Sequence, residues 1–431
     1  MRAVQRAARE YRHHEALQLT ELGLEASEKL KTLSEERAWA MTQRFALLIE
    51  RVDILAMQGR RAEQEQTLDL LQPLTEALGD KAKLALVLRK KGNLFLALGK
   101  YQEAQDVMLR ALEVSHVAGA RMSEAHCSLE LGRIYANQGN YEEALSATQA
   151  ALALYQEIAP KSRNVAVCWN NLGLWLRGLS RPAEALANYR KALEIVQESG
   201  DRMVQALVFT NVGNIHENLG QYEEASSYYR QYLELIRELG VREREGDGWV
   251  NLGIVYVNLA RFEEASAAYE QAIKIFEEVK AQSGLGLSLQ GLGDVHSEQK
   301  KLSEALKYYV RAREVFEQIG AKDELVTGLS REAGAHLDLG ALDRALAIST
   351  QAIQMLHDGQ SCNKPEEVYF TQHRILTATG RQAEARAFLQ KAYETVMRFA
   401  SDFHEEAIRR SLLERVKVNR LIVEAWKNDS R

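Results

Sequence analysis

The chain has 431 residues, of which 46% are hydrophobic and 27% are charged, so it can bury a core and is not disordered. Its 55 basic and 60 acidic residues give a net charge of -5, which provides no general attraction to nucleic acid or to anionic lipid. Only 4 prolines occur among many strong helix formers, which argues against an all-β sandwich. We therefore expect neither a nucleic-acid partner nor a membrane partner.

The cysteines and the chain start indicate the compartment. Cys127, Cys168 and Cys362 are too few for a disulfide framework and have no CxxC spacing, which is typical of a reducing environment. The first residues are charged and lack the apolar segment of a signal peptide, and no run approaches the roughly 18 apolar residues of a membrane helix. These features predict a cytoplasmic protein.

Small residues recur at a fixed interval along most of the chain. An alanine returns every 40 residues, with one step of 41: Ala104, Ala144, Ala185, Ala225, Ala265, Ala305, Ala345 and Ala385. Twelve residues before these lie Gly92, Gly132, Gly173, Gly213, Gly253 and Gly293, followed by Ala333 and His373. A third small residue comes seven positions after each alanine, except at Tyr232. Such positions are expected where two helices cross closely.

Each repeat predicts two helices. Residues 203–220 and 221–240 both carry apolar residues at helical spacing and end in glycine, the residue that most readily ends a helix in the left-handed conformation. Paired glutamates such as Glu223 and Glu224 fall in the first turn of the second helix, where the helix dipole favours negative charge. The sequence therefore predicts an all-α, right-handed superhelical solenoid of antiparallel helix pairs.

The repeat resembles a known family. Trp249-x2-Leu252-Gly253-x2-Tyr256, followed by Ala265 and Tyr269, is similar to the tetratricopeptide repeat signature, although the usual period is 34 residues. The longer form resembles the repeats of Pins-type adaptors, kinesin light chains and the sensor region of the maltose-regulon activator. This resemblance implies that the first helix of each repeat lines a concave surface that binds a protein or peptide.

The two ends depart from the repeat. Residues 1–33 are interpreted as a truncated repeat with the imperfect motif Tyr11–Ala16, and residues 34–79 as a degenerate first full repeat. Residues 80–400 then hold eight repeats, and residues 401–431 are interpreted as a capping helix. Because the first repeat is incomplete, we expect the chain to be a fragment of a larger protein. The segment from Ser411 to Trp426 resembles the closing segments of bacterial regulators, which implies a covalently linked effector domain.

Catalytic and metal sites are not indicated. His216, His296 and His336 share one repeat position, but neighbouring helices lie about 8–10 Å apart, too far for three ligands to meet one ion at about 2 Å. We find no nucleophile with a base and no phosphate-binding loop in the right context. The sequence therefore predicts no enzyme activity, no metal and no cofactor.

Asparagines indicate a candidate binding surface. Asn171, Asn211 and Asn251 occupy the same point of three successive predicted first helices, although asparagine is unfavourable inside a helix. Their amides can grip a peptide backbone, since an amide both donates and accepts hydrogen bonds; alternatively, they fix the stacking of neighbouring helices. Further asparagines on the same helices are Asn170, Asn214, Asn218 and Asn258.

Charge is graded along the same predicted surface. The earlier repeats offer Arg89, Lys90, Arg133 and Arg177, and the later repeats offer Glu217, Asp247, Asp294, Glu298 and Asp338. Opposite charge at the two ends orients a bipolar ligand, although scattered surface charge would also account for the pattern. We expect a non-catalytic module that binds an extended partner segment, with a small-molecule sensor in a bacterial signalling NTPase or transcription regulator as the alternative.

Overall fold

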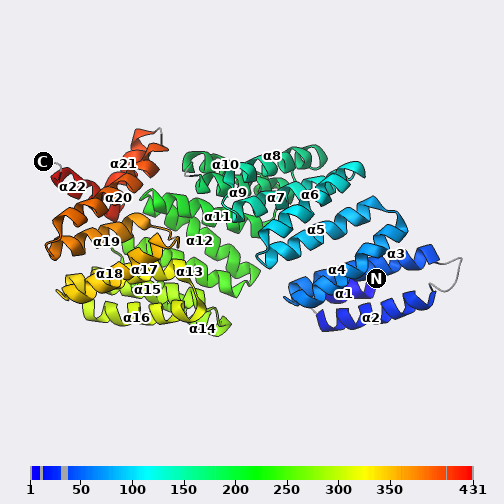
Figure 1. The fold of residues 1–431 in the computed structure, drawn as a ribbon, viewed down its shortest axis with the longest axis horizontal. Coiled ribbons are helices and arrows are strands. Elements are labelled where there is room, and N and C mark those ends of the chain that lie inside the picture. Colours follow the sequence, from blue (N-terminus) through cyan, green and yellow to red (C-terminus); the bar gives the residue numbers. More distant parts are fainter. Residues whose placement is uncertain are drawn as a thin grey trace. The chain divides into compact units, whose positions relative to one another are not determined.

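The computed structural model describes residues 2–9, 13–30, 37–179, 181–360, 362–403 and 405–429. These residues form 22 α-helices and no strand (Figure 1). The chain divides into two compact units, unit 1 over Met1–Leu179 and unit 2 over Ser180–Arg431. Tyr11 and Arg12, which belong to the imperfect N-terminal motif, lie outside the described residues.

Each unit is a series of helices joined by short turns. Unit 1 contains α1 (Arg2–Arg9), α2 (His13–Leu30), α3 (Arg37–Met57), α4 (Arg61–Leu78), α5 (Lys81–Ala97), α6 (Tyr101–Val117), α7 (Arg121–Asn137), α8 (Tyr141–Ile158) and α9 (Arg163–Gly178). Unit 2 begins with α10 (Pro182–Ser199), α11 (Arg202–Asn218), α12 (Tyr222–Leu239), α13 (Arg242–Asn258), α14 (Phe262–Val279), α15 (Gln282–Glu298) and α16 (Leu302–Ile319). It ends with α17 (Lys322–Asp338), α18 (Leu342–His357), α19 (Pro365–Ala378), α20 (Gln382–Ser401), α21 (Glu406–Glu414) and α22 (Lys417–Asp429).

Helix pairs are the building blocks of both units. The most extensive packing joins an odd-numbered helix to the even-numbered helix that follows it, as in α7 with α8 and α15 with α16. Each pair also packs on the next, as α14 does on α15. The predicted all-α fold of paired helices is confirmed.

The odd-numbered helices form the inner layer. In unit 2, α13 contacts α15, α15 contacts α17, and α17 contacts α19; in unit 1, α5 contacts α7. Up to α20, successive even-numbered helices of the described residues show no packing of this extent, and α22 at the C-terminal end is the exception, since it packs on α20. A stack whose odd-numbered layer is more closely spaced curves toward that layer. The odd-numbered helices therefore line the concave face of each unit.

The repeated alanines lie where helices cross. All eight, from Ala104 to Ala385, are at most 1% exposed, so a larger side chain has no room there. This degree of burial agrees with the predicted close crossings. The predicted glycine stops are confirmed, since Gly220 and Gly240 both adopt φ +69°. Lys300 adopts the same left-handed conformation without being glycine, with φ +62°.

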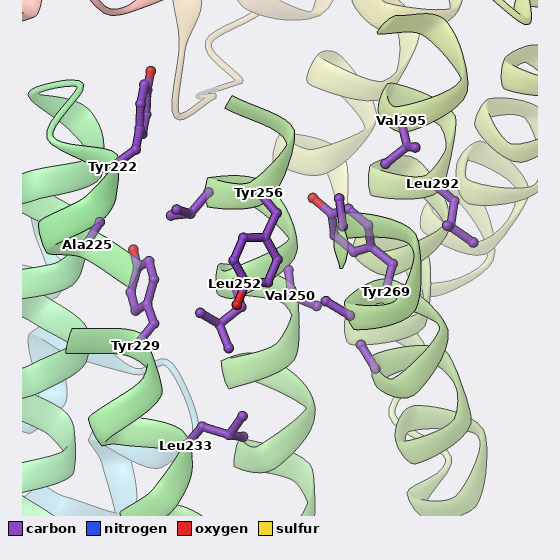
Figure 2. Packing of buried hydrophobic residues seen from close by; sticks show 14 of the residues in the cluster. Tyr222, Ala225, Tyr229, Leu233, Val250, Leu252, Tyr256, Tyr269, Leu292 and Val295 are labelled. Atoms are coloured by element: carbon purple, nitrogen blue, oxygen red, sulfur yellow. The ribbon is translucent and has the colours of Figure 1, made fainter. Parts of the chain in front are cut away.

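Figure 2 shows how the interior is built in unit 2, where a continuous apolar cluster spans α12 to α15. Tyr229 and Leu233 of α12 face Leu252 of α13, and Tyr269 of α14 lies between α13 and α15, whose Leu292 belongs to the same cluster. Each helix therefore shares its buried side chains with the pair before and the pair after.

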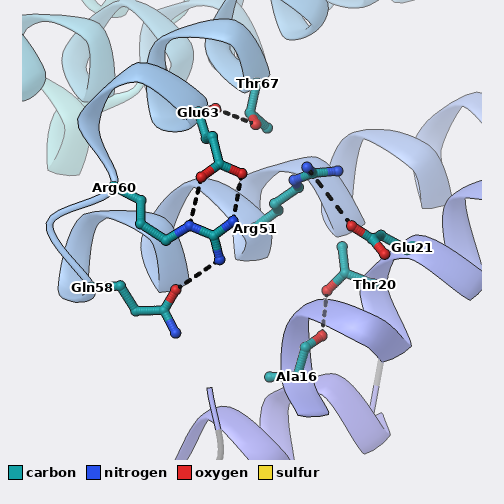
Figure 3. Close-up of polar contacts among 8 residues, drawn as sticks. All are labelled: Ala16, Thr20, Glu21, Arg51, Gln58, Arg60, Glu63 and Thr67. Carbon is teal, nitrogen blue, oxygen red and sulfur yellow. Dashed lines mark hydrogen bonds and ion pairs between the residues drawn. The ribbon is translucent and has the colours of Figure 1, made fainter. Parts of the chain in front are cut away.

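Short ion pairs mark the turns before the even-numbered helices. In unit 1, Arg60 stands immediately before α4 and its Nη2 lies 2.6 Å from Oε2 of Glu63 in the first turn (Figure 3). Equivalent pairs are formed by Arg181 with Glu184, Arg261 with Glu264, and Arg381 with Glu384. Because these side chains are largely exposed, each pair contributes little to stability.

The C-terminal helices return to an early part of unit 2. Both α21 and α22 pack on α20, beside which they are drawn in red in Figure 1. The Ser411 hydroxyl of α21 donates to the Leu219 carbonyl oxygen at the end of α11, at 2.8 Å. Lys417 Nζ of α22 lies 2.6 Å from Glu298 Oε1 at the end of α15. The predicted cap at 401–431 thus comprises the last residue of α20 and these two helices.

Candidate binding site

Two buried tyrosines of unit 2 place their hydroxyl groups among polar side chains of the odd-numbered helices, which line the concave face. The Tyr229 hydroxyl of α12 lies 2.6 Å from Asn214 Oδ1 and 3.0 Å from Glu217 Oε2, both on α11, and donates to this pair. Two repeats later, the Tyr309 hydroxyl of α16 donates to Asp294 Oδ1 of α15 at 2.8 Å. Outer-layer rings therefore hold inner-layer polar side chains in fixed positions.

The glycine column makes room for these rings. A Cβ atom on Gly213 would lie 2.6 Å from the nearest ring carbon of Tyr229, and one on Gly293 would lie 2.4 Å from that of Tyr309. Both distances are too short for any side chain. We predicted that these glycines allow helices to cross closely. The structure shows in addition that a tyrosine ring occupies the space that a side chain at each of these two positions would fill.

Arg331 joins three repeats on the same face. Its Nη1 lies 2.6 Å from Asp294 Oδ2 of α15, and its Nε lies 3.6 Å from Glu367 Oε1 of α19. The Arg331 and Asp294 side chains are only 24% and 23% exposed. Burial raises the pKa of Asp294 to about 6 even though Arg331 opposes this. Burial also disfavours the charge of Arg331, but Asp294 and Glu367 hold the pKa of the guanidinium above its ordinary value.

Most acidic residues of the predicted charge gradient have basic partners. Glu298 pairs with Lys417, and Asp294 with Arg331, as described above. The remaining distances are 2.6 Å from Asp338 Oδ1 to Arg374 Nη2 and 3.7 Å from Glu217 Oε1 to Lys364 Nζ. The partners Lys364 and Arg374 were not among the residues predicted for the site. The acidic character of this face is therefore largely offset by neighbouring cations.

Asp247 differs from the other acids of the gradient. Burial, reinforced by the charge of Glu243, raises the pKa of this carboxyl, and Arg244 opposes the shift. The raised pKa means that Asp247 gives up its proton less readily than a fully solvated aspartate.

The candidate asparagines fall into two groups. Asn170 and Asn171 of α9 belong to unit 1 and are 7% and 8% exposed, and Asn170 Nδ2 donates to Asn171 Oδ1 at 3.5 Å. The others belong to unit 2, where Asn211, Asn214 and Asn251 are half-buried, and Asn218 and Asn258 are exposed. Asn258 Nδ2 donates to the Ile254 carbonyl oxygen of its own helix at 2.9 Å.

Two half-buried candidate amides of unit 2 keep unused hydrogen-bonding groups. Among the contacts of the described residues, Asn251 makes no hydrogen bond, and Asn214 uses its Oδ1 but not its Nδ2. Asn214 is held by Tyr229, so its amide group has a defined direction. These two residues are therefore the best-placed amides for contacting a ligand.

The candidate arginines all lie in unit 1. Arg133 Nη1 of α7 lies 2.8 Å from Glu130 Oε2 on the same helix, and Arg177 of α9 is exposed. Arg89 of α5 is half-buried and, within the described residues, has no ion pair.

The buried tyrosines were not among the residues predicted for the site, although their spacing in the sequence indicates them. Tyr189, Tyr229, Tyr269 and Tyr309 each follow a repeated alanine by four residues, one helical turn, and are at most 3% exposed. Four tyrosines in phase with four glycines would have indicated that each glycine accommodates a ring.

Two further properties concern the described residues as a whole. They contain no group of three or more His, Cys, Asp and Glu side chains that could hold a metal ion. None of their helices combines the length and the apolar character that crossing a membrane requires.

Comparison with known proteins identifies the repeat. A tetratricopeptide repeat family model matches residues 124–198 and 202–278. The 43 kDa receptor-associated protein of the synapse from Gallus gallus is 29% identical over 127 residues, which are 29% of this chain and 31% of that protein. The match therefore spans about a third of the length of this relative.

Solved structures share the fold at low identity. The apo form of the quorum sensor NprR from B. thuringiensis has a TM-score of 0.62 and 17% identity, over 78% of this chain and 97% of that one. A Rap protein complexed with Competence and Sporulation Factor has a TM-score of 0.51 and 15% identity, over 82% and 97%.

A Signal Transduction ATPase with Numerous Domains with a tetratricopeptide repeat sensor, from Pyrococcus horikoshii, has a TM-score of 0.55 and 14% identity. It is matched over 88% of this chain but only 56% of its own length. Residues 124–198 and 202–278 of the present chain are thus tetratricopeptide repeats, and the chain has the all-α fold of tetratricopeptide-repeat solenoids.

Proposed function

We propose that the chain is a non-catalytic binding scaffold or sensor, and that an extended segment of a protein or peptide partner lies along the concave face of unit 2. The observation that carries this proposal is the pair of amides at Asn214 and Asn251, which belong to the inner-layer helices α11 and α13 and keep unused hydrogen-bonding groups. Peptide groups of an extended chain need both donors and acceptors, and amides supply both.

The distribution of polar groups favours an extended ligand over a compact one. Tyr229 and Asn214 lie near α11, Asp294 on α15, Arg331 on α17 and Glu367 on α19. They follow the stack across five repeats instead of converging on one point. A compact small molecule is normally recognised by convergent polar groups in one pocket.

The solved structures of similar fold are consistent with this role. One is named a quorum sensor, one contains a tetratricopeptide repeat sensor, and one is complexed with Competence and Sporulation Factor. Because their identity to this chain is at most 17%, they support the class of function and not the ligand. A cytoplasmic location and a linked effector domain belong to the same proposal.

Selection of a displayed library of linear peptides against the whole chain tests the proposal. Asn251→Ala should weaken a selected peptide about 2- to 12-fold, the loss of one net hydrogen bond of about 0.5–1.5 kcal/mol. Asn188→Ala is the matched control, because Asn188 lies on the outer helix α10 and bonds to the Glu184 carbonyl oxygen. Equal binding by the Asn251 and Asn188 variants, measured by calorimetry, would contradict the proposed face.

A further inference from the structure

A depression of about 440 Å³ lies in unit 1, whereas the face proposed above belongs to unit 2. It is formed by the first half of α5, the turn before α7 and the first turns of α7. Its volume is within the range of about 300–1,000 Å³ that is usual for small-ligand sites. Leu86 and Met122 contribute apolar surface, and Met122 is 41% exposed.

The ionisable groups that line this depression are all basic. Arg89, Arg121 and His126 line it, and no aspartate or glutamate does among the described residues. Arg121 is exposed and pairs with Glu157 of α8. Burial, followed by the charge of Arg89, lowers the pKa of His126, so this ring is neutral near pH 7. Arg89 is therefore the principal uncompensated charge at the depression.

Most cations of α5 are paired with an acid, but Arg89 is not. Lys83 pairs with Asp80, Lys90 with Asp53, and Lys91 Nζ lies 2.9 Å from Asp69 Oδ1. Arg89, in contrast, has neither an ion pair nor a hydrogen bond to any described residue, and its Nε is buried without a partner. Burying an unpaired guanidinium nitrogen is unfavourable, so an anion that binds there would relieve a cost already present in the fold.

The glutamates of the neighbouring helix α7 already have other partners. Of the two glutamates on α7, Glu130 Oε2 lies 2.8 Å from Arg133 Nη1, and Glu124 Oε1 lies 3.4 Å from His116 Nδ1. The Tyr155 ring meets His126 edge-on at 5.6 Å, and the Tyr155 hydroxyl is also buried without a partner.

We propose that this depression is a second binding site, for a small amphipathic carboxylate. The guanidinium of Arg89 matches the two oxygens of a carboxylate, and Leu86 and Met122 cover the aliphatic body of the ligand. Charge complementarity determines the head group, and the apolar lining determines the tail. This site goes beyond the function proposed for unit 2 and would make unit 1 responsive to a small molecule.

Titration of the whole chain with octanoate, followed by calorimetry, tests the site. Octanoate should bind saturably, and octanol, which has the same tail without the charge, should bind at least about tenfold more weakly. Arg89→Gln should weaken octanoate by a similar factor. The matched control Lys91→Gln removes a charge from the same helix outside the depression and should leave octanoate binding unchanged.

Binding measurements with other ligands distinguish the alternatives. If inorganic phosphate binds as well as octanoate, the depression is a simple anion site. If the binding of the peptide N-acetyl-Leu-Glu-Leu-amide depends on Arg89 and the binding of octanoate does not, the site belongs to a peptide. Either result overturns the proposal, as does equal octanoate binding by wild type and Arg89→Gln. If Arg89→Gln fails to fold, Met122→Glu, which supplies a carboxylate at an exposed position, should abolish octanoate binding. The Asn251 test in unit 2 is independent of these outcomes.

Discussion

A Cβ atom on Gly253 would lie 2.7 Å from two ring carbons of Tyr269, so the glycine and the tyrosine fill one space together. The tyrosine ring is 1% exposed and belongs to the apolar cluster of Figure 2. The two residues depend on each other, because the ring occupies the space that a side chain on Gly253 would fill.

Gly253→Ala should therefore lower the free energy of unfolding by about 1–3 kcal/mol, the usual cost of overpacking a core. Gly334→Ala is the matched control, because Gly334 also lies inside a helix and its added Cβ would meet only Thr371 Cγ2, at 3.9 Å. It should stabilise by about 0.5–1 kcal/mol, since glycine is unfavourable in a helix. Chemical denaturation of both variants checks this; two changes of the same sign would refute our account of the glycine column.

Asp294 should impose a specific pH dependence on unit 2. Its pKa of about 6 lies above the ordinary value of 3.8, so between these values the folded state binds more protons than the unfolded state. Stability contributed by this group therefore falls as the pH rises from about 4 to 6. Asp294→Asn removes this titration.

The free energy of unfolding of wild type minus that of Asp294→Asn should decrease by about 1–3 kcal/mol across this pH interval. Denaturation curves recorded at a series of pH values measure the difference directly. Parallel stability profiles for the two proteins would show that the Arg331 ion pair fully compensates the burial of the carboxylate.

Lys300 occupies a turn position at φ +62°, which glycine tolerates and a lysine does not favour. Lys300→Gly should stabilise unit 2 by about 0.5–1 kcal/mol. This net gain is the backbone strain that the substitution relieves, minus the entropy cost of ordering the more flexible glycine. The neighbouring Lys301 has φ -88°, so Lys301→Gly relieves no strain and should not stabilise. Melting temperatures of the two variants provide the comparison.

The two interpretations of the candidate asparagines, ligand binding and the fixing of helix stacking, can be tested one residue at a time. Asn171 is 8% exposed, and its replacement by alanine should lower the free energy of unfolding by about 1–2 kcal/mol. Asn251 makes no hydrogen bond within the described residues, and Asn251→Ala should change stability by less than about 0.5 kcal/mol. Thermal unfolding of both variants measures this, and a large loss with Asn251→Ala would make that amide structural.

The repeat could be predicted because its cause is local. A buried alanine such as Ala225 and a left-handed glycine such as Gly240 are each required by the geometry of one helix pair, and the 40-residue period repeats that requirement. The helix pairs and their turns follow from these residues alone.

The polar network could not be predicted in the same way. Arg331 and Asp294 are 37 residues apart, one period less three positions, and their ion pair depends on how far adjacent inner helices are displaced along their axes. Sequence periodicity does not determine that displacement. The contact of Ser411 with Leu219 spans 192 residues and lies outside the repeat pattern altogether.

That last contact changes how unit 2 is expected to fold. In an open stack, each repeat touches only its neighbours, so the ends unfold first and the folding free energy is nearly additive along the chain. Here Ser411 and Lys417 connect the last helices to the ends of α11 and α15, which closes a long loop of chain late in folding. The first and last repeats of unit 2 are thereby made mutually dependent. Loss of α21 and α22 would free both ends at once, and unfolding would become gradual instead of cooperative.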